Sequence, residues 1–416
     1  MQFDIFFSLS HTPVNGNLPS EKVLLKNFFD QVKAADQLGY ETAWIAESHL
    51  SSQTQKKNPH PVVPHWQGEI GINTDIFQLA HMIFDQTHQI EVGSAVMNLF
   101  TNGGPIAAAE RVATFLSLHE LREQNRRLKI GFSAGRFEYM SRAYGVLPRN
   151  PLEEKFWPMV KNQFFSEACE IFLKLLSKKE ISSQDISIRY LEEDNFRSPQ
   201  EWLQAQEAFT PKNHMSRIPI DKFYEFDLLK IVPQNFNLNL LDLIIGSHVP
   251  HMQIEVNKHL PVKVFNLSIT KPEIIDATHH RMQAHYHKDG GEWQRAYMPR
   301  TTFVFINEQK NLSPKQRSQK AREEAKLALS AYWTALEGTV DPKKIQDASD
   351  NALIGTAEEI SEQMNKRFHE DDTLMLWFDF FNHDSKRLIE NMQAFKEKVV
   401  PQFDTKKRGY PDFLKR

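Results

Sequence analysis

Hydrophobic and polar residues along this chain form short apolar runs of strand length that alternate with longer amphipathic stretches of helix length. The apolar runs lie at residues 3–8, 42–47, 90–97, 128–133, 241–246, 262–267, 301–306 and 373–380. Alternating strands and helices are typical of an α/β fold with a parallel sheet. Because there are eight such strands, the pattern predicts a (β/α)8 barrel, the TIM-barrel fold.

Proline, serine and glycine residues mark the ends of the predicted helices. These helices cover residues 20–38, 105–121, 154–176, 272–286, 314–336, 356–368 and 386–399. The first opens at Pro19 and Ser20 and closes at Gly39, and the second has a proline in its first turn, where no backbone N–H is needed.

The chain has 416 residues, whereas a (β/α)8 barrel needs only about 250. Two segments hold the surplus: residues 48–73, after the second strand, and residues 146–240, between the fourth and fifth strands. Neither has a second set of alternating strands, so neither is expected to form an independent domain. We expect one barrel domain over residues 1–403 with these two insertions, followed by a basic C-terminal tail at residues 404–416.

Composition and charge narrow the class of protein. The chain has 50 Lys and Arg against 53 Asp and Glu, a net charge of −3, which gives no reason to expect nucleic acid or an anionic membrane as a partner. No apolar run approaches the ~18 residues that a membrane span needs. The start of the chain resembles a strand rather than a signal peptide, and Cys169 lies in an apolar pattern that predicts a buried, inert thiol. We expect a cytoplasmic protein.

Candidate chemistry lies just after the strands, because the loops at the carboxyl ends of barrel strands carry the functional residues. The candidates after the second, third, fourth and fifth strands are, in order, Glu47 and His49; Ala95, Val96 and Asn98; Ser133, Gly135 and Arg136; and Ser247. Glycine and serine at the start of a helix suit a phosphate, since free N–H groups and the helix dipole favour an anion there. The set predicts a planar ligand with a phosphate tail.

Several of these segments, in their order and spacing, resemble one known family. They are residues 3–8, 39–49, 90–98, 105–118, 129–144, 243–247, 355–359, 374–380 and 400–403. The family is that of the luciferase-like flavin-dependent monooxygenases, which are (β/α)8 barrels that bind FMN at the strand ends. The resemblance runs along the whole chain except the two insertions.

The resemblance implies a cofactor, a reaction and partners. Reduced FMN, supplied by a separate flavin reductase, would react with O₂ to give a flavin peroxide that oxidises a small organic substrate. A deazaflavin is the alternative cofactor. No GxGxxG nicotinamide fingerprint occurs in the chain, so the reductase would be another protein. A homodimer is common in the family.

The resemblance also implies roles for individual residues. Ala95 and Val96 match a pair joined by a non-proline cis peptide under the flavin ring, and Asn98 and Ser133 lie near that ring. The positions that hold the ribityl phosphate match Gly135, Arg136 and Ser247.

Glu47 and His49 match the active-site acid and the second histidine of a Glu-His-His run, and they stand two residues apart on a strand, so they share a face. Ser48 replaces the first histidine of that run, which argues against light emission and leaves monooxygenation open. The segment at residues 48–73, with Trp66, is expected to cover the strand ends and keep water out.

Other functions also fit parts of the sequence. Residues 131–135 satisfy the G-x-S-x-G pattern of a hydrolase nucleophile at Ser133, with Asp379 and His383 as the late acid and base. The histidines between residues 279 and 287 suggest a metal site, although no carboxylate stands at ligand spacing among them. A flavin-binding barrel without catalysis and a deazaflavin-dependent oxidoreductase of the same fold are further alternatives.

Overall fold

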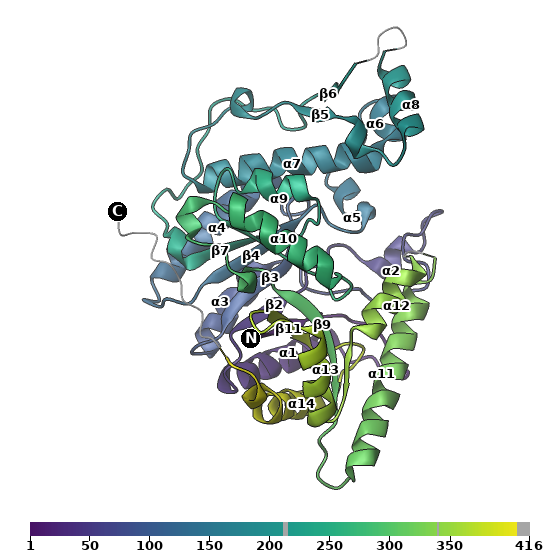
Figure 1. The fold of residues 1–416 in the computed structure, drawn as a ribbon. Coiled ribbons are helices and arrows are strands. Elements are labelled where there is room, and N and C mark those ends of the chain that lie inside the picture. The colour runs from purple at the N-terminus through teal and green to yellow at the C-terminus, as the bar shows by residue number, and fades with distance from the viewer. Residues whose placement is uncertain (211–214, 339–340, 406–416) are drawn as a thin grey trace.

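A parallel sheet of nine strands forms the centre of the computed structural model, which describes residues 1–210, 215–338 and 341–405 (Figure 1). The strands of this sheet are β1 (Gln2–Phe7), β2 (Thr42–Ile45), β3 (Glu91–Asn98), β4 (Leu128–Ser133), β7 (Leu241–Ile245), β8 (Val262–Val264), β9 (Arg300–Ile306), β10 (Leu353–Gly355) and β11 (Thr373–Trp377). All eight predicted strands are present, and β10 is additional. Most of the predicted basic tail, residues 406–416, lies outside the described residues.

The sheet curls until its ends meet. Its strands follow the order β10, β9, β11, β1, β2, β3, β4, β7, β8. Just after β8, Asn266 forms a parallel bridge with Arg300 at the start of β9. The Asn266 N–H donates to the Pro299 carbonyl at 2.9 Å, and the Thr301 N–H donates to the Asn266 carbonyl at 3.3 Å. The predicted (β/α)8 barrel is therefore confirmed.

Helices cover the outside of the sheet (Figure 1). The main ones are α1 (Glu21–Gln37), α3 (Ile76–Gln86), α4 (Gly104–Glu120), α7 (Trp157–Leu176), α9 (Pro250–Val256), α10 (Pro272–His285), α11 (Pro314–Leu336), α13 (Ala357–Arg367) and α14 (Ser385–Lys398). Shorter helices near the strand ends or in the insertions are α2 (Ser52–Gln55), α5 (Glu138–Ala143), α6 (Pro151–Lys155), α8 (Pro199–Phe209) and α12 (Pro342–Asp350).

The structure has helices that were not predicted, α8 and α9 among them, and two of the differences from the prediction have a clear local cause. The long helix predicted over residues 154–176 begins only at Trp157, because Phe156 leaves helical geometry (φ −115°, ψ 31°) and Pro158 has no N–H to continue an earlier helix. Helix α3 was not predicted. It begins at Asp75, whose side chain accepts hydrogen bonds from the N–H groups of Phe77 and Gln78 and so caps the helix.

An apolar cluster fills the barrel interior. Phe6, Trp44, Ile244, Phe265 and Met375 are buried in it, and the partly buried Ala46, Ala95, Val96 and Trp377 pack against them. Two glycines on neighbouring strands make room for the rings. A Cβ atom at Gly93 would lie 2.2 Å from the Trp44 ring, and one at Gly131 would lie 2.3 Å from the Phe265 ring. This barrel floor leaves the strand ends above it as the place for a ligand.

Charged residues at the amino-terminal end of the barrel are paired with one another. Lys129, only 2% exposed in its side chain, lies 2.6 Å from Glu91. Asp242 pairs with Arg127 at 3.1 Å and with Lys263 at 2.9 Å. These buried charges are engaged with one another, as buried ions require, rather than directed at a ligand.

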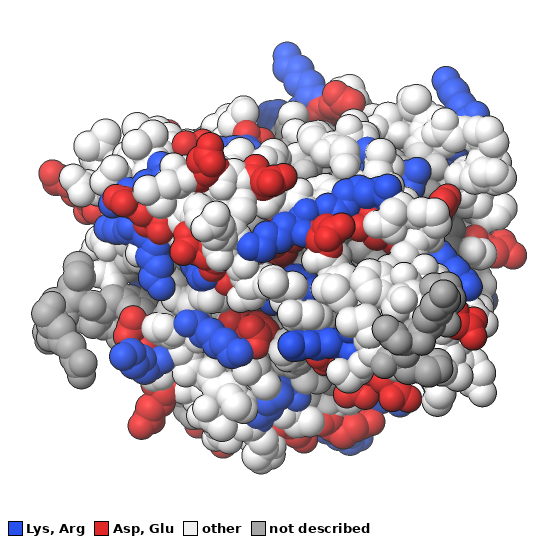
Figure 2. Space-filling view, turned by 90° about the horizontal axis from the view of Figure 1, so that it is seen from above, with Lys and Arg blue, Asp and Glu red and all other residues white. Residues whose placement is uncertain are grey.

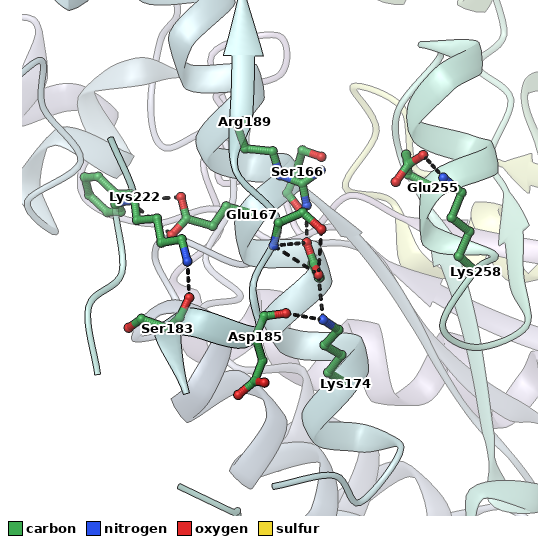
Figure 3. Close-up of polar contacts among 12 residues, drawn as sticks. Ser166, Glu167, Lys174, Ser183, Asp185, Arg189, Lys222, Glu255 and Lys258 are labelled. Carbon is green, nitrogen blue, oxygen red and sulfur yellow. Dashed lines mark hydrogen bonds and ion pairs between the residues drawn. The ribbon is translucent and has the colours of Figure 1, made fainter. Parts of the chain in front are cut away.

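Two buried carboxylates on α7, Glu167 and Glu170, hold later parts of the segment 146–240 against that helix; Figure 3 shows Glu167 and Arg189. Glu167 accepts hydrogen bonds from the backbone N–H groups of Phe223 and Tyr224, both at 2.9 Å. Glu170 pairs with Arg189 at 2.5 Å, in the strand β5 (Arg189–Leu191), which lies antiparallel to β6 (Ile218–Ile220). The insertion therefore adds a small sheet of its own outside the barrel (Figure 1).

The surface carries mixed charge. On the face seen in Figure 2, Lys and Arg side chains are interspersed with Asp and Glu, and no broad area of one sign is visible. No helix in the described part of the chain has the length and apolar character of a membrane span. Cys169 is buried within α7, as predicted, and burial raises the pKa of its thiol.

Candidate functional site

Glu47 and His49 meet just beyond the end of β2. The Nε2 atom of His49 lies 2.9 Å from Oε1 of Glu47, and only 7% of the histidine side chain and 1% of the glutamate side chain are exposed. Oε1 also accepts hydrogen bonds from the backbone N–H of Asn98 at 3.0 Å and from Nδ2 of Asn102 at 2.8 Å. Three N–H groups therefore converge on one carboxylate oxygen.

Ser48 lies between the members of this pair but packs elsewhere. Its N–H donates to the carbonyl of Asn73 at 2.9 Å. Ser48 also lies close to Gly71: a Cβ atom added to Gly71 would be 3.2 Å from the Cβ atom of Ser48. The residue that stands where the family has a histidine is thus directed toward the first insertion.

The third strand brings small residues to the barrel floor. The peptide bond between Ala95 and Val96 is cis, as the resemblance implies. Both side chains are partly buried against the apolar cluster that contains Trp44. Next to them, a Cβ at Gly246 would lie 3.5 Å from the Val96 side chain and 3.3 Å from Cβ of Ser133. The ends of β3, β4 and β7 thus form one continuous surface.

Asn98 and Gly135 are in direct contact. Gly135 has a φ of +75°, and a Cβ on it would lie 2.2 Å from Nδ2 of Asn98. A glycine is therefore required for both its backbone conformation and the space that it leaves. The Gly135 N–H donates to Oγ of Ser133 at 3.1 Å. These three candidates form one group, as their strand-end positions predict.

Arg136 and Ser247 stand apart from this group. Arg136 is exposed, and its guanidinium lies 5.3 Å from the centre of the Phe137 ring. Oγ of Ser247 accepts from the Val249 N–H at 3.3 Å. Among the described residues, no hydrogen bond joins either of them to the other candidates, so their predicted role at a phosphate remains a prediction.

Two buried polar atoms of the candidate residues have no partner among the described residues: Oε2 of Glu47 and Nδ2 of Asn98. A buried polar atom without a hydrogen bond is costly, and such atoms often mark where a ligand binds. The Glu47 atom is an acceptor and the Asn98 atom is a donor, and both residues are near the apolar surface of Ala95 and Val96. This combination fits a flat ring with donors and acceptors on its edge, as a flavin has.

The first insertion extends across the strand ends. Val63 and Trp66 are buried in a cluster with Ala335 and Leu336 of α11 and Ile345 of α12. Phe137, after β4, and Phe381, after β11, pack against the same cluster. Residues from two strand-end loops and two helices thus meet around the insertion, which is the arrangement expected of a cover that excludes water.

Three residues that belong to this region were not assigned to it from the sequence, although Asn102 was considered, with Gly103 and Gly104, as an oxyanion loop of the alternative hydrolase. Asn102, which the sequence places in a glycine-rich loop, contacts Glu47, and Arg111 of α4 donates to Asn102 at 2.6 Å. Tyr144 is 47% exposed, and its ring centre lies 6.1 Å from that of His49. A sequence motif would not reveal these contacts, because they join loops and a helix that are distant along the chain.

The residues of the alternative hydrolase are not assembled. Oγ of Ser133 accepts from Gly135, whereas Asp379 accepts from the N–H and Oγ–H of Ser8, both at 3.0 Å. Nε2 of His383 lies 2.6 Å from the Thr12 carbonyl. The described residues hold no group of three or more His, Cys, Asp or Glu side chains arranged to bind a metal.

Residues 1–189 match the family model of the luciferase-like monooxygenases. No curated protein matches the sequence. Among solved structures, the monooxygenase RslO1 from Streptomyces bottropensis is 14% identical with a TM-score of 0.65, and the match covers 97% of this chain and 99% of that one.

Two further structures illustrate the range of the fold. The oxygenating constituent of 3,6-diketocamphane monooxygenase from Pseudomonas putida, solved with FMN, is 13% identical with a TM-score of 0.58, covering 97% of this chain and 99% of that one. An F420-dependent secondary alcohol dehydrogenase, solved with an F420-acetone adduct, is 14% identical with a TM-score of 0.57, covering 96% of this chain and 98% of that one.

The solved structures agree with this chain in fold from end to end, which places it among the (β/α)8 barrels. Within that fold, residues 1–189 are similar to the luciferase-like monooxygenases, whose family model they match.

Proposed function

We propose that this protein is an FMN-dependent monooxygenase that uses reduced flavin and O₂ to oxidise a small organic substrate. The observation that carries the proposal is the buried Glu47–His49 pair, with Oε2 of Glu47 and Nδ2 of Asn98 left without partners among the described residues, beside the barrel floor. Reduced FMN, supplied by a separate flavin reductase, would provide the electrons that activate O₂.

The cofactor would be held by residues of four strand ends. Ala95 and Val96 would support the ring, and the polar atoms of Asn98 and Ser133 would border it. Gly135, Arg136 and Ser247 are the residues proposed for the ribityl phosphate. Arg136 would supply the positive charge for that phosphate.

His49 and Glu47 would handle protons at the mouth of β2. The Nε2 atom of His49 is engaged by Glu47, so the opposite ring nitrogen, Nδ1, is the atom that can give or take a proton. The cover formed by the first insertion, with Trp66 7% exposed, would keep water from the reacting groups.

Cofactor binding gives the first test. We expect FMN to bind in the micromolar range or tighter, and FAD to bind more weakly, because one exposed cation, Arg136, suits a single terminal phosphate. Absorbance or fluorescence titration with FMN, FAD and a deazaflavin measures this. Equal or better affinity for FAD would count against the site, and preference for the deazaflavin would favour a deazaflavin-dependent oxidoreductase.

A pair of glycine variants controls this titration. Gly135→Ala would place a Cβ 2.2 Å from Nδ2 of Asn98, whereas Gly145, which also has a positive φ, +84°, has nothing within 4 Å of its Cβ position. Both variants carry the same kind of backbone strain. Only Gly135→Ala is expected to weaken FMN binding, by about tenfold or more, since only it disturbs a ligand-facing group.

A substitution of Ser133 distinguishes the proposed oxygenase from the alternative hydrolase. Because no histidine is hydrogen-bonded to Ser133 in the described structure and its Oγ accepts from Gly135, Ser133→Ala should leave oxygen-dependent turnover within about tenfold. Loss of a nucleophile would cost on the order of 10⁴. Ester hydrolysis by the wild type that disappears in Ser133→Ala would overturn the proposed function.

A further inference from the structure

We propose that Arg111 is a positioning residue that fixes the geometry of Glu47 and His49 through Asn102. The inference deepens the proposed function, on which it rests for the role of the pair. Arg111 stands in the middle of α4 and touches neither Glu47 nor His49. Its effect would therefore pass through the side chain between them.

The contacts form an unbroken path. Nη2 of Arg111 lies 2.7 Å from Oδ2 of Asp75, and Nη1 donates to Oδ1 of Asn102 at 2.6 Å. Nδ2 of Asn102 donates to Oε1 of Glu47 at 2.8 Å, and the same oxygen lies 2.9 Å from Nε2 of His49. Four side-chain contacts thus connect the start of α3 with the imidazole at the mouth of β2.

The chemistry of arginine sets the orientation of the Asn102 amide along this path, and the carboxylate of Glu47 sets the direction of the last hydrogen bond. A guanidinium has donors and no acceptor, so the atom of Asn102 that faces Arg111 must be the carbonyl oxygen. The NH₂ group of Asn102 then faces Glu47 and also donates to the Asn98 carbonyl at 3.0 Å. The carboxylate of Glu47 has only acceptor atoms, so Nε2 of His49, which faces it, carries the hydrogen. In the neutral ring, Nδ1 of His49 is thereby assigned as the atom without hydrogen.

The outer end of the path is held firmly. Asp75 is the N-cap of α3, with its Oδ1 accepting from the Phe77 N–H at 3.0 Å. The Arg111 guanidinium also lies 4.8 Å from the centre of the Phe77 ring. Asn102 is only 5% exposed, so losing the donation from Arg111 would leave its carbonyl buried and unpaired. The side chain would then turn from Glu47 to find another partner.

The test measures which ring nitrogen of His49 carries the hydrogen, in protein without cofactor. Protein labelled with ¹⁵N-histidine is studied by NMR at about pH 8.5, where ordinary imidazoles are neutral, and the His49 signals are assigned by their loss in His49→Gln. The wild type should show hydrogen on Nε2 and none on Nδ1. In Arg111→Met, the ratio of the two tautomers should shift toward Nδ1–H by about tenfold, the effect of one hydrogen bond.

A second ion pair between the same helices supplies the matched control. Arg122, just after α4, lies 2.9 Å from Asp85 of α3, far along the helices from Asn102. Arg122→Met should keep the wild-type tautomer, although it too removes an ion pair. Arg111→Lys should give an intermediate ratio, because one ammonium cannot meet Asp75 and Asn102 with the fork geometry of a guanidinium.

The wild-type tautomer in both Arg111→Met and Arg111→Lys would overturn the proposal. If Arg111→Met does not fold, Arg111→Lys and Asp75→Asn, which retains a good N-cap residue, decide the question in the same way. Because the measurement uses no flavin, O₂ or substrate, its outcome is independent of whether the protein proves to be an oxygenase.

Discussion

Replacing His49 by alanine is expected to lower product formation by about 10² to 10⁴ in FMN-loaded protein, the usual cost of losing a general acid or base. The barrel should still fold, since the ring contributes one hydrogen bond, to Glu47. The measurement is the amount of product formed for each O₂ consumed, together with release of hydrogen peroxide, which should rise as oxygen is reduced without reaching the substrate.

A histidine at another strand end serves as the control. His383, after β11, is bonded to the Thr12 carbonyl and has no proposed part in the reaction. His383→Ala should lower thermal stability and leave the coupling of oxygen to product unchanged. If His49→Ala behaves in the same way, His49 has a structural role only.

Replacing Asp379 by asparagine is expected to stabilise the fold at neutral pH. Burial raises the pKa of Asp379 from 3.8 to about 6, although Ser8 donates two hydrogen bonds to its carboxylate, which lower it. The native protein therefore holds this proton more tightly than the unfolded chain does. The free energy of unfolding falls as pH rises from about 4 to about 6, and the difference between the two pKa values corresponds to on the order of 3 kcal/mol.

Urea unfolding at several pH values measures this effect. An asparagine side chain at this position could still accept both hydrogen bonds from Ser8 but would not ionise, so the stability of Asp379→Asn relative to wild type should increase from pH 4 to pH 7 and level off above. Asp227→Asn, at an exposed position, controls for the lost charge. Wild-type and Asp379→Asn curves that stay parallel across this range would show that Asp379 does not titrate in the way described.

The barrel could be predicted from the sequence because the pattern of an apolar strand followed by a helix is repeated along the chain. Each strand is a short apolar run, and all eight recur in alternation with helices, as a barrel requires. The break at Phe156 was missed because it depends on one proline inside an otherwise continuous helical pattern. Helix α3 was missed although its apolar residues, from Ile76 to Phe84, have helical spacing and follow an aspartate cap.

Candidate residues at the ends of strands could be predicted from the sequence. Contacts between segments that are distant along the chain could not. Glu47 and His49 were expected on one face of a strand; β2 ends at Ile45, and the two residues meet in the short segment that follows it. The contact of Asn98 with Gly135 depends on how β3 and β4 align, and the path from Arg111 to Glu47 passes from a helix to a loop to another strand. Spacing along one sequence carries no signal for such contacts.

The apolar floor built around Trp44 and Phe265 separates the two ends of the barrel. Below it, Lys129 and Asp242 are engaged with opposite charges, and above it lie the unpaired atoms of the candidate site. A substitution below the floor therefore changes groups that do not border the candidate site, and a substitution above it leaves the charge pairs of the lower end in place.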